Sequence, residues 1–191
     1  AQRSFEHSLQ ELGIDRIDLW LLHEATADDL DSSDLLPVLQ QMRQEKRIGM
    51  FGIGGERSHL DALWKRHRDY CRVLQFEWSV LDAVPNFPDA FCIQHRAVSG
   101  ALGAIRESFA RDPALCRRWS EAIDADLASP GILAGLLLVA SLESNCNSIV
   151  LFSSRVPEHI RTNVRLVDDS AWAARSQQFL KVLQNHGNGA H

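Results

Sequence analysis

The sequence predicts an α/β protein in which parallel strands alternate with helices. Its 191 residues are enough to bury a sizeable core, and we expect one domain over residues 1–191. The predicted strands are short and apolar almost throughout, which favours burial on both faces over half-exposed hairpins. Segments with apolar residues at helical spacing separate these strands. Parallel pairing with right-handed crossovers is therefore expected.

Each element is predicted from its local pattern, beginning with an N-terminal helix. Phe5, Leu9 and Leu12 recur at helical spacing before a glycine. The segment 17–22 is an apolar strand, and the acidic stretch 24–33 is interpreted as a loop. In chain order, further strands are expected at 47–53, 72–76, 91–94 and 148–152, and helices at 2–12, 35–46, 58–67, 102–109, 113–127, 130–143, 157–167 and 170–183.

Two prolines mark helix starts in the second half of the chain. Pro130 suits a first helical turn with Ser129 as its N-cap, and Pro157 opens the predicted helix at 157–167. The apolar run 132–142 is too short to span a bilayer, so we expect it to form a core helix.

Five strand–helix units in a row are compatible with two architectures. One is an open doubly wound sheet, and the other is five of the eight units of a (β/α)8 barrel. Only eleven residues precede the segment 12–23, so we expect the first three strands of such a barrel to be missing. The strands at 17–22 and 148–152 would then be apolar edges that invite pairing. A second copy, a complementing fragment or the terminal helices could cover them.

Composition excludes several function classes. The net charge of −5 and the absence of a clustered basic face argue against nucleic-acid binding, since the pair Arg117–Arg118 is too small a patch. The four cysteines form no CxxC pair and no zinc-site spacing, and Cys71 and Cys92 are expected to be buried apolar residues. The N-terminus lacks an apolar signal-peptide core, so a cytoplasmic protein is expected. The acidic residues, interpreted as a solvated loop and helix start rather than a metal site, are Asp28, Asp29, Asp31 and Asp34.

Four segments, in a fixed order, resemble the C-terminal part of the aldo-keto reductases, from the helix before their fourth barrel strand to the end. The segments are 12–23 (LGIDRIDLWLLH), 45–54 (EKRIGMFGIG), 73–82 (VLQFEWSVLD) and 148–164 (SIVLFSSRVPEHIRTNV). Each is modest on its own, but four in order at fitting separations make chance similarity improbable. The resemblance implies a partial (β/α)8 barrel and an NADP-dependent reduction of aldehydes or ketones.

The resemblance also implies roles at the ends of the first four strands. His23 matches the active-site histidine that orients the substrate carbonyl, and Gln75 matches the residue that contacts the nicotinamide carboxamide. Gly54 and Gly55 replace the Ser-Asn pair that holds the same amide, so that contact is in doubt. Arg96 falls where many members place Tyr or Arg beside the nicotinamide.

By the same resemblance, the last matching segment implies a binding site for the adenosine 2′-phosphate and adenine. Its residues would be Ser154, Arg155, His159 and Asn163. A helix that begins at Pro157 offers free N–H groups and the positive end of its dipole to an anion. Helix capping is the structural alternative for these four residues. For His23 the alternative is a hydrogen-bonded structural residue, for Gln75 an ordinary polar strand end, for Gly54 a tight turn, and for Arg96 a solvent-facing position.

The chain departs from the resemblance in its catalytic acid. The Asp, Tyr and Lys that aldo-keto reductases carry on their first three strands have no counterpart, and Tyr70 is the one tyrosine. The lysines Lys46, Lys65 and Lys181 are expected on helices or their ends. We therefore hold two hypotheses. The chain is a carbonyl reductase or its cofactor-binding portion, with a small-molecule substrate, or it is a non-catalytic remnant that acts as an interaction module.

Overall fold

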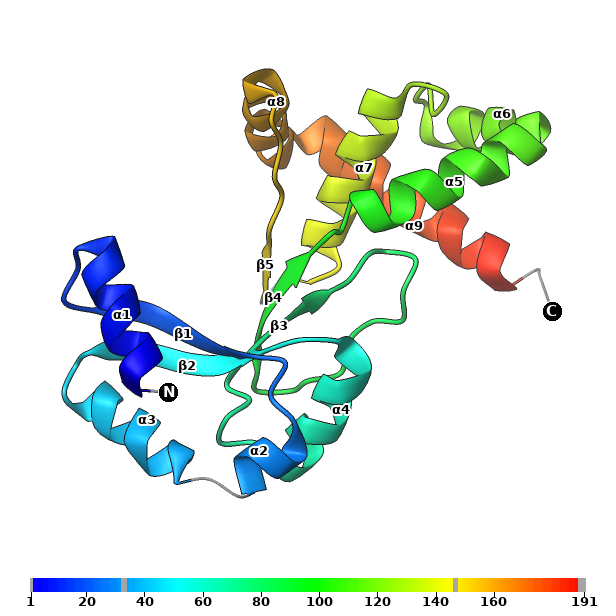
Figure 1. Ribbon diagram of the computed structural model, residues 1–191. Helices are drawn as coiled ribbons and strands as arrows, with labels where there is room; N and C mark the ends of the chain where they lie inside the picture. Colours follow the sequence, from blue (N-terminus) through cyan, green and yellow to red (C-terminus); the bar gives the residue numbers. More distant parts are fainter. Residues whose placement is uncertain (1, 32–33, 146–147, 189–191) are drawn as a thin grey trace. The chain divides into compact units, whose positions relative to one another are not determined.

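A computed structural model describes residues 2–31, 34–145 and 148–188 (Figure 1). Strands and helices alternate along the chain as the sequence predicts. The strands are β1 (Ile17–His23), β2 (Ile48–Gly54), β3 (Val73–Glu77), β4 (Phe91–His95) and β5 (Ser148–Val150). The helices are α1 (Gln2–Leu12), α2 (Ala27–Asp31), α3 (Leu35–Gln44), α4 (Arg57–Arg66), α5 (Ser99–Arg111), α6 (Pro113–Ile123), α7 (Pro130–Glu143), α8 (Pro157–Val167) and α9 (Ser170–Asn188).

The strands form one open parallel sheet in the sequential order β1-β2-β3-β4-β5. Parallel register pairs Ile17 with Ile48 at one end of β1 and β2, and Ile53 with Leu74 between β2 and β3. The expected α/β class is therefore confirmed. A doubly wound sheet reverses its strand order at a switch point. The order here shows no reversal among the described strands, as in the progression of a (β/α)8 barrel.

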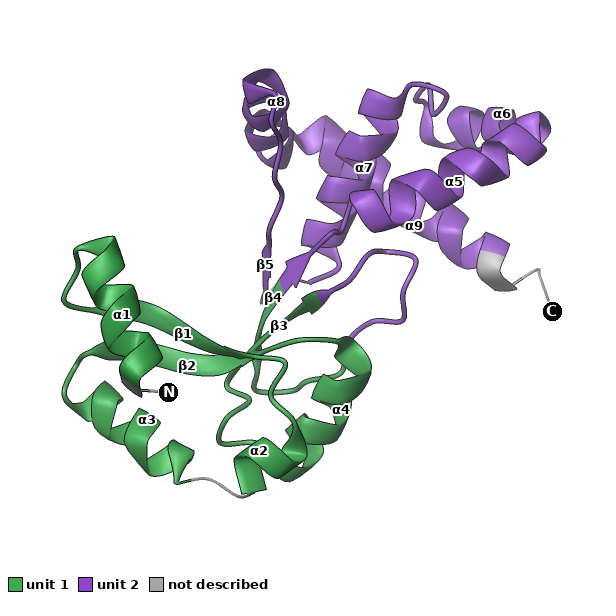
Figure 2. Cartoon of the chain, in the orientation of Figure 1, with its two compact units in different colours: residues 1–76, 86–93 green, residues 77–85, 94–191 purple. Residues whose placement is uncertain are grey.

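The chain divides into two compact units, which are coloured separately in Figure 2. Unit 1 comprises residues 1–76 and 86–93, and unit 2 comprises residues 77–85 and 94–191. Each unit contains its own apolar core, so each is described by itself below.

The core of unit 1 lies between its strands and the helices that cover them. Ile48, Ile53 and Leu74 are fully buried. Phe5 of α1 packs edge-on against Trp20 of β1, with ring centroids 5.0 Å apart. Gly52 is required in β2, because a Cβ there would collide with the backbone carbonyl of Val73. This close approach holds β2 against β3 and aligns their carboxyl ends.

The core of unit 2 is helical and centres on α7. Eight residues of α7 are buried, and α5, α6 and α9 contribute aromatic side chains beside it. The ring of Trp119 packs edge-on against Phe109 at 5.5 Å and Phe179 at 6.3 Å. The expectation of a core helix over 132–142 is therefore confirmed. No helix in the described part of the chain is long and apolar enough to cross a membrane.

The structure corrects the expected loop at 24–33, because α2 lies within it. The backbone N–H of Thr26 donates to Asp29 Oδ2 at 2.9 Å, and the Asp29 N–H donates to Thr26 Oγ1 at 3.2 Å. This reciprocal pair is a capping box, which satisfies two N–H groups that a helix start leaves open. The Thr-x-x-Asp spacing was a signal in the sequence for this short helix.

Smaller corrections concern element ends. β5 is shorter than expected and ends at Val150, whereas α5 begins three residues earlier, at Ser99. Ser129 occupies the N-cap of α7 as expected, but its side chain makes no capping hydrogen bond. The described cysteines are free thiols, and Cys146 lies outside the described residues.

Candidate functional site

Three of the predicted site residues form a row at the carboxyl ends of β1, β2 and β3 in unit 1. The parallel register pairs His23 with Gly54, and Gly54 with Gln75. The backbone continues this alignment beyond the strands. The Glu24 N–H donates to the Gly54 carbonyl at 2.7 Å, and the Gly55 N–H donates to the Gln75 carbonyl at 3.0 Å. Three positions far apart in sequence thus become neighbours on one rim.

The two glycines of this row leave space beside the Gln75 amide. A Cβ on Gly54 would lie 3.4 Å from Gln75 Oε1, and a Cβ on Gly55 would lie 3.7 Å from the Glu24 Cα. Neither glycine has a positive φ, so the backbone does not require glycine there. Within the described ranges, the half-buried Gln75 side chain has no hydrogen-bond partner. Its amide is therefore available to a ligand on this rim.

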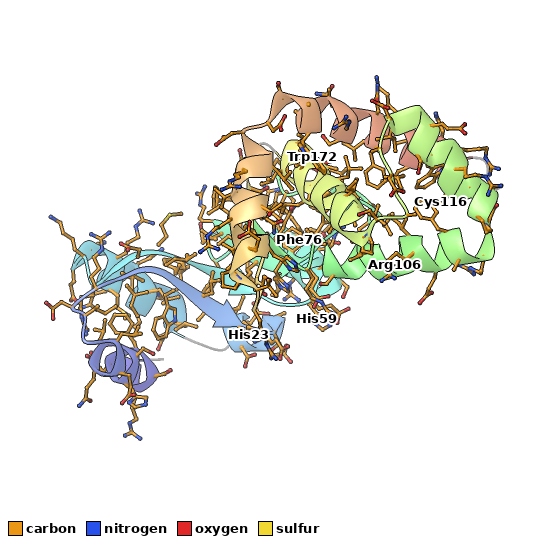
Figure 3. The ribbon with its side chains drawn as sticks, turned by 90° about the horizontal axis from the view of Figure 1, so that it is seen from above. His23, His59, Phe76, Arg106, Cys116 and Trp172 are labelled. Carbon is orange, nitrogen blue, oxygen red and sulfur yellow. The ribbon has the colours of Figure 1, made fainter. Side chains whose placement is uncertain are left out.

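His23 and His59, both labelled in Figure 3, lie on exposed positions of unit 1. His23 is the last residue of β1, and His59 lies in the first turn of α4, just after the Gly54–Gly55 turn. The sequence analysis did not single out His59. The sequence did contain a signal for His59, because this residue lies in the first turn of the helix that follows β2, a strand that carries a predicted site residue.

Arg96 lines a cavity in unit 2 where β4 and β5 end. The cavity has a volume of about 680 Å³. Its lining includes His95, Arg96, Ser99, Leu138, Leu151 and Ser153. Arg96 adopts a left-handed conformation, with φ of 60°, and this turns the chain from β4 toward α5. Its guanidinium group lies 2.9 Å from the Glu77 carboxylate in an exposed ion pair. Sequence reasoning missed Ser99 and Ser153.

The remaining predicted residues lie just before α8 or within it. They are Ser154, Arg155, His159 and Asn163. Ser154 Oγ accepts a hydrogen bond from the Val156 N–H at 3.1 Å and lies 3.4 Å from His159 Nδ1. The N-cap of α8 is Val156 and no side chain caps this helix, so these contacts of Ser154 belong to the loop that precedes it. Arg155 is exposed, and Asn163 is half-buried one turn beyond His159.

The electrostatics at this helix start are mixed. Pro157 occupies the first turn, where its missing N–H removes one of the open donors. Glu158 places a carboxylate at the positive end of the helix dipole and pairs with Arg161 at 3.2 Å. An anion at this site would therefore depend on Arg155 to offset the Glu158 charge.

The five predicted residues of unit 2 are Arg96, Ser154, Arg155, His159 and Asn163, and those of unit 1 are His23, Gly54 and Gln75. Within unit 1 all three residues are neighbours. Within unit 2, Ser154 contacts His159, and Arg96 shares its cavity with Ser153, the residue before Ser154.

Among the residues that the structure describes, the tyrosine and the lysines form no pair that could act as a proton donor. Tyr70 is buried, and its ring packs against Phe51 and His67 with centroids 6.4 Å apart in both cases. Lys46 follows α3, and Lys65 lies in the last turn of α4. Cys71 and Cys92 offer no reactive alternative, because burial raises the pKa of the Cys71 thiol to about 11 and also raises that of Cys92.

The acidic residues near α2 are structural. Asp28 and Asp29 occupy the first turn of α2, and Asp31 forms an ion pair with Arg66 at 2.8 Å. Hydrogen bonds from Thr26 hold the pKa of Asp29 below its usual range. Within residues 2–31, 34–145 and 148–188, no group of three or more His, Cys, Asp or Glu side chains is arranged to hold a metal ion.

Comparisons with known proteins identify the fold. No family profile and no curated protein matches the chain. Among solved structures, an aldo-keto reductase from Brucella melitensis is 20% identical with a TM-score of 0.61, over 93% of this chain and 66% of its own. An aldo-keto reductase from Bacillus halodurans, in its holo form, is 21% identical with a TM-score of 0.63, over 95% of this chain and 65% of its own.

An aldo/keto reductase from Klebsiella pneumoniae, solved in complex with NADP and acetate, is 16% identical with a TM-score of 0.62. The match covers 94% of this chain and 64% of the Klebsiella chain. This chain thus spans somewhat less than two thirds of these three proteins. Identities this low establish likeness of fold. Nearly the whole chain therefore has an aldo-keto-reductase-like fold, as the sequence motifs suggested.

Proposed function

We propose that this chain is the cofactor-binding portion of an NADP-dependent oxidoreductase that reduces aldehydes or ketones. The observation that carries the proposal is the row of His23, Gly54 and Gln75 at the carboxyl ends of three successive parallel strands. Ligands of parallel α/β barrels bind at this end of the strands, because the loops that follow them converge there.

Each residue of the row has a task that its chemistry suits. Gln75 offers an amide oxygen and an amide N–H₂ group, which together can pair with the carboxamide of nicotinamide. His23 is an exposed imidazole that can donate a hydrogen bond to a substrate carbonyl and so orient it. Gly54 adds no side chain, so it leaves room for a planar ring to approach Gln75.

Taken by itself, unit 2 offers side chains that suit the binding of phosphate. Arg96 and Ser99 line the cavity of about 680 Å³ after β4, and this volume suits a nucleotide. Arg155 precedes α8 and supplies an exposed guanidinium group for a further phosphate. Two features oppose binding, namely the Arg96–Glu77 ion pair and the Glu158 carboxylate. We therefore expect weak affinity, with Arg96 exchanging Glu77 for phosphate.

Turnover by these residues alone is not expected. Bound NADPH supplies a hydride, but reduction of a carbonyl also needs a proton donor. The single tyrosine is buried against Phe51 and His67, so its hydroxyl is not exposed to supply that proton. The proposal thus predicts cofactor binding without carbonyl reduction by the isolated chain.

Titration of the chain with NADPH, followed by calorimetry and by nicotinamide fluorescence, tests this proposal. Gln75→Ala should weaken binding by roughly tenfold, as expected for the loss of a hydrogen-bonded pair. Gln40→Ala, at an exposed position of α3, is the matched control and should leave the affinity unchanged. Absence of binding at millimolar NADPH would exclude the proposal.

A gain-of-contact variant sharpens the test. Gly54→Ser with Gly55→Asn restores the polar pair that the family resemblance assigns to these positions. Both substitutions fit, because the built Cβ positions keep 3.4 Å or more from their neighbours. The double variant should bind NADPH several-fold more tightly than the parent chain. Equal or weaker binding would show that nicotinamide does not bind at the carboxyl ends of β1, β2 and β3.

The alternative function is a non-catalytic interaction module. One observation favours it, which is the row of exposed apolar residues along α8. A melting temperature that does not respond to NADPH but rises with an added protein partner would support this alternative, because a ligand of the native state stabilises it by mass action.

A further inference from the structure

Unit 2 contains a second cavity, which is separate from the candidate functional site. Its volume is about 470 Å³, and it lies between the connection that follows β3, helices α5 and α6, and the second half of α9. All of its lining residues belong to unit 2, coloured purple in Figure 2. It shares no residue with the row at the ends of β1, β2 and β3 or with the cavity at Arg96. A ligand of this cavity would therefore be distinct from the proposed cofactor.

The wall of the cavity is rich in aromatic side chains. Trp78, Phe109 and Trp119 are buried and line it. The Trp119 ring packs edge-on against Phe109 at 5.5 Å and against His186, which also lines the cavity, at 5.4 Å. Leu81, in the same lining, is 44% exposed, so part of the apolar wall is open to water. Since aromatic rings favour edge-on and offset contacts with further rings, this wall suits a planar aromatic ligand.

The side of the cavity formed by residues 78–84 is held in place by its own hydrogen bonds. The indole Nε1–H of Trp78 donates to the Ala83 carbonyl at 3.1 Å. Asp82 Oδ2 accepts a hydrogen bond from the Ser79 N–H at 2.8 Å and another from Ser79 Oγ at 2.9 Å. Because this wall is already ordered, a ligand can bind without the entropic cost of fixing a loop.

The polar groups of the cavity suit a single hydroxyl group on the ligand. Ser108 Oγ and Ser144 Oγ each donate to a helix carbonyl, at 3.0 Å and 2.8 Å, so their lone pairs can accept a further hydrogen bond. Gln184 is exposed and offers an amide N–H₂ group as a donor. Among the described residues, the lining contains the Asp82 carboxylate and the His186 imidazole but no Lys or Arg. An uncharged ligand therefore fits better than an anion.

The size of the cavity restricts its occupant to a small molecule. An apolar cavity of about 150 Å³ is enough to hold benzene, so this cavity of about 470 Å³ has room for two fused rings. One turn of an α-helix occupies roughly 500 Å³, given a diameter of about 10–12 Å and a pitch of about 5.4 Å. A helical segment of a protein partner therefore does not fit.

We propose that this cavity binds an uncharged aromatic molecule of two fused rings that carries one hydroxyl group, as a naphthol does. Its rings pack among Trp78, Phe109 and Trp119. Its hydroxyl group donates to Ser108 Oγ or Ser144 Oγ, and the Gln184 amide can donate to the hydroxyl oxygen. The proposal does not depend on cofactor binding, because the two sites have no side chain in common.

Calorimetric titration of the chain with 2-naphthol, without NADPH, tests the proposal. 2-Naphthol should bind saturably, with a dissociation constant below the millimolar range. The anion 2-naphthalenesulfonate has the same rings and should bind at least about tenfold more weakly. Absence of binding at millimolar 2-naphthol would overturn the proposal, and equal affinity for the sulfonate would overturn the assignment of an uncharged ligand.

The indole N–H resonances of the five tryptophans locate the bound molecule. Those of Trp78 and Trp119 should shift when 2-naphthol is added, because an aromatic ring in the cavity changes their magnetic environment. Trp20, Trp64 and Trp172 do not line the cavity, so their resonances should stay in place. Equal shifts of all five would show non-specific association and would overturn the site.

A matched pair of substitutions in α5 gives a second check of the location. Ala104 lines the cavity at an exposed position, so Ala104→Phe should partly fill it without emptying the core. This variant should weaken the binding of 2-naphthol by at least about tenfold. Ala110→Phe lies at an exposed position of the same helix outside the cavity and should preserve the affinity. With unchanged melting temperatures in both variants, equal affinities would contradict the proposed site.

Discussion

Helices α7 and α8 have similar first turns but differ in how many of their residues are buried. Both have proline in the first turn, Pro130 and Pro157, and they contain 14 and 11 residues. Eight residues of α7 are buried, whereas α8 buries only Leu166. α7 packs against α5, α8, α9 and β5, so most of its sides meet apolar neighbours. The comparison teaches that the number of neighbours, not the helix sequence alone, decides how much apolar surface is buried.

The strands repeat this contrast. β2 lies between two strands, and five of its seven residues are buried, while β5 ends the sheet order and buries Val150 alone. Both strands are apolar. Residues are therefore well covered in β2 and incompletely covered in β5 and α8.

The largest expected effect comes from emptying the core around α7. Leu136→Ala removes a fully buried side chain and should lower the free energy of unfolding by roughly 2–5 kcal/mol. Val164→Ala, at an exposed position of α8, should lower it by less than about 0.5 kcal/mol. Urea denaturation of both variants gives the difference. Equal losses would show that α8 is as well packed as α7.

A second variant tests the contact between the two helices. Gly135→Val would bring a Cβ to 2.9 Å from Leu166 Cδ1 and 2.9 Å from Trp172 Cζ3, the ring labelled in Figure 3. Overpacking of this kind costs about 1–3 kcal/mol. Chemical denaturation should show that loss, and Gly103→Val, where a Cβ has no neighbour within 4 Å, is the control for the intrinsic effect of valine in a helix.

A substitution at Gln94 tests whether the buried side of β4, which lies next to β5, is free of water. Its side chain is fully buried, and neither its Oε1 nor its Nε2 has a partner among the described residues. An unpaired buried amide is costly, so Gln94→Leu should raise the free energy of unfolding by about 1 kcal/mol. Thermal unfolding measures this change. A lower melting temperature would show that the amide is hydrogen-bonded in solution.

The smallest effect distinguishes capping from packing as the source of helix stability. Asp112 caps α6 by accepting a hydrogen bond from the Leu115 N–H at 3.0 Å, whereas Ser129 makes no such bond at α7. That hydrogen bond, with a smaller contribution from Arg118, holds the pKa of Asp112 below its usual range. The capping stabilisation is therefore fully present above the unfolded pKa of about 4 and is lost progressively as the pH falls through the lower pKa of the folded state.

Asp112→Ala should accordingly lower the melting temperature at pH 7 and lower it by less at pH 3. Ser129→Ala should have little effect at either pH. If Ser129→Ala were the more damaging substitution at pH 7, capping rather than packing would explain the stability of α7.

The succession of strands and helices was predictable because it depends on short-range patterns. Apolar runs of strand length, helical spacing and first-turn prolines predicted all five strands and most helices within a few residues. The miss at α2 has a local cause, since the reciprocal Thr26–Asp29 hydrogen bonds stabilise one short turn that lacks an apolar face. The barrel-type strand order was left open by local patterns, because both candidate architectures use the same units.

The sequence by itself determined the alternation of elements and the identity of the candidate site residues. Only the tertiary structure decided that His23, Gly54 and Gln75 are adjacent, since strand register depends on contacts between residues 21 or 31 positions apart, such as the approach of Gly52 to Val73. It likewise decided that the apolar residues of α8 are exposed. Burial depends on which other elements pack against a segment. An apolar residue pattern indicates only that some element should pack there.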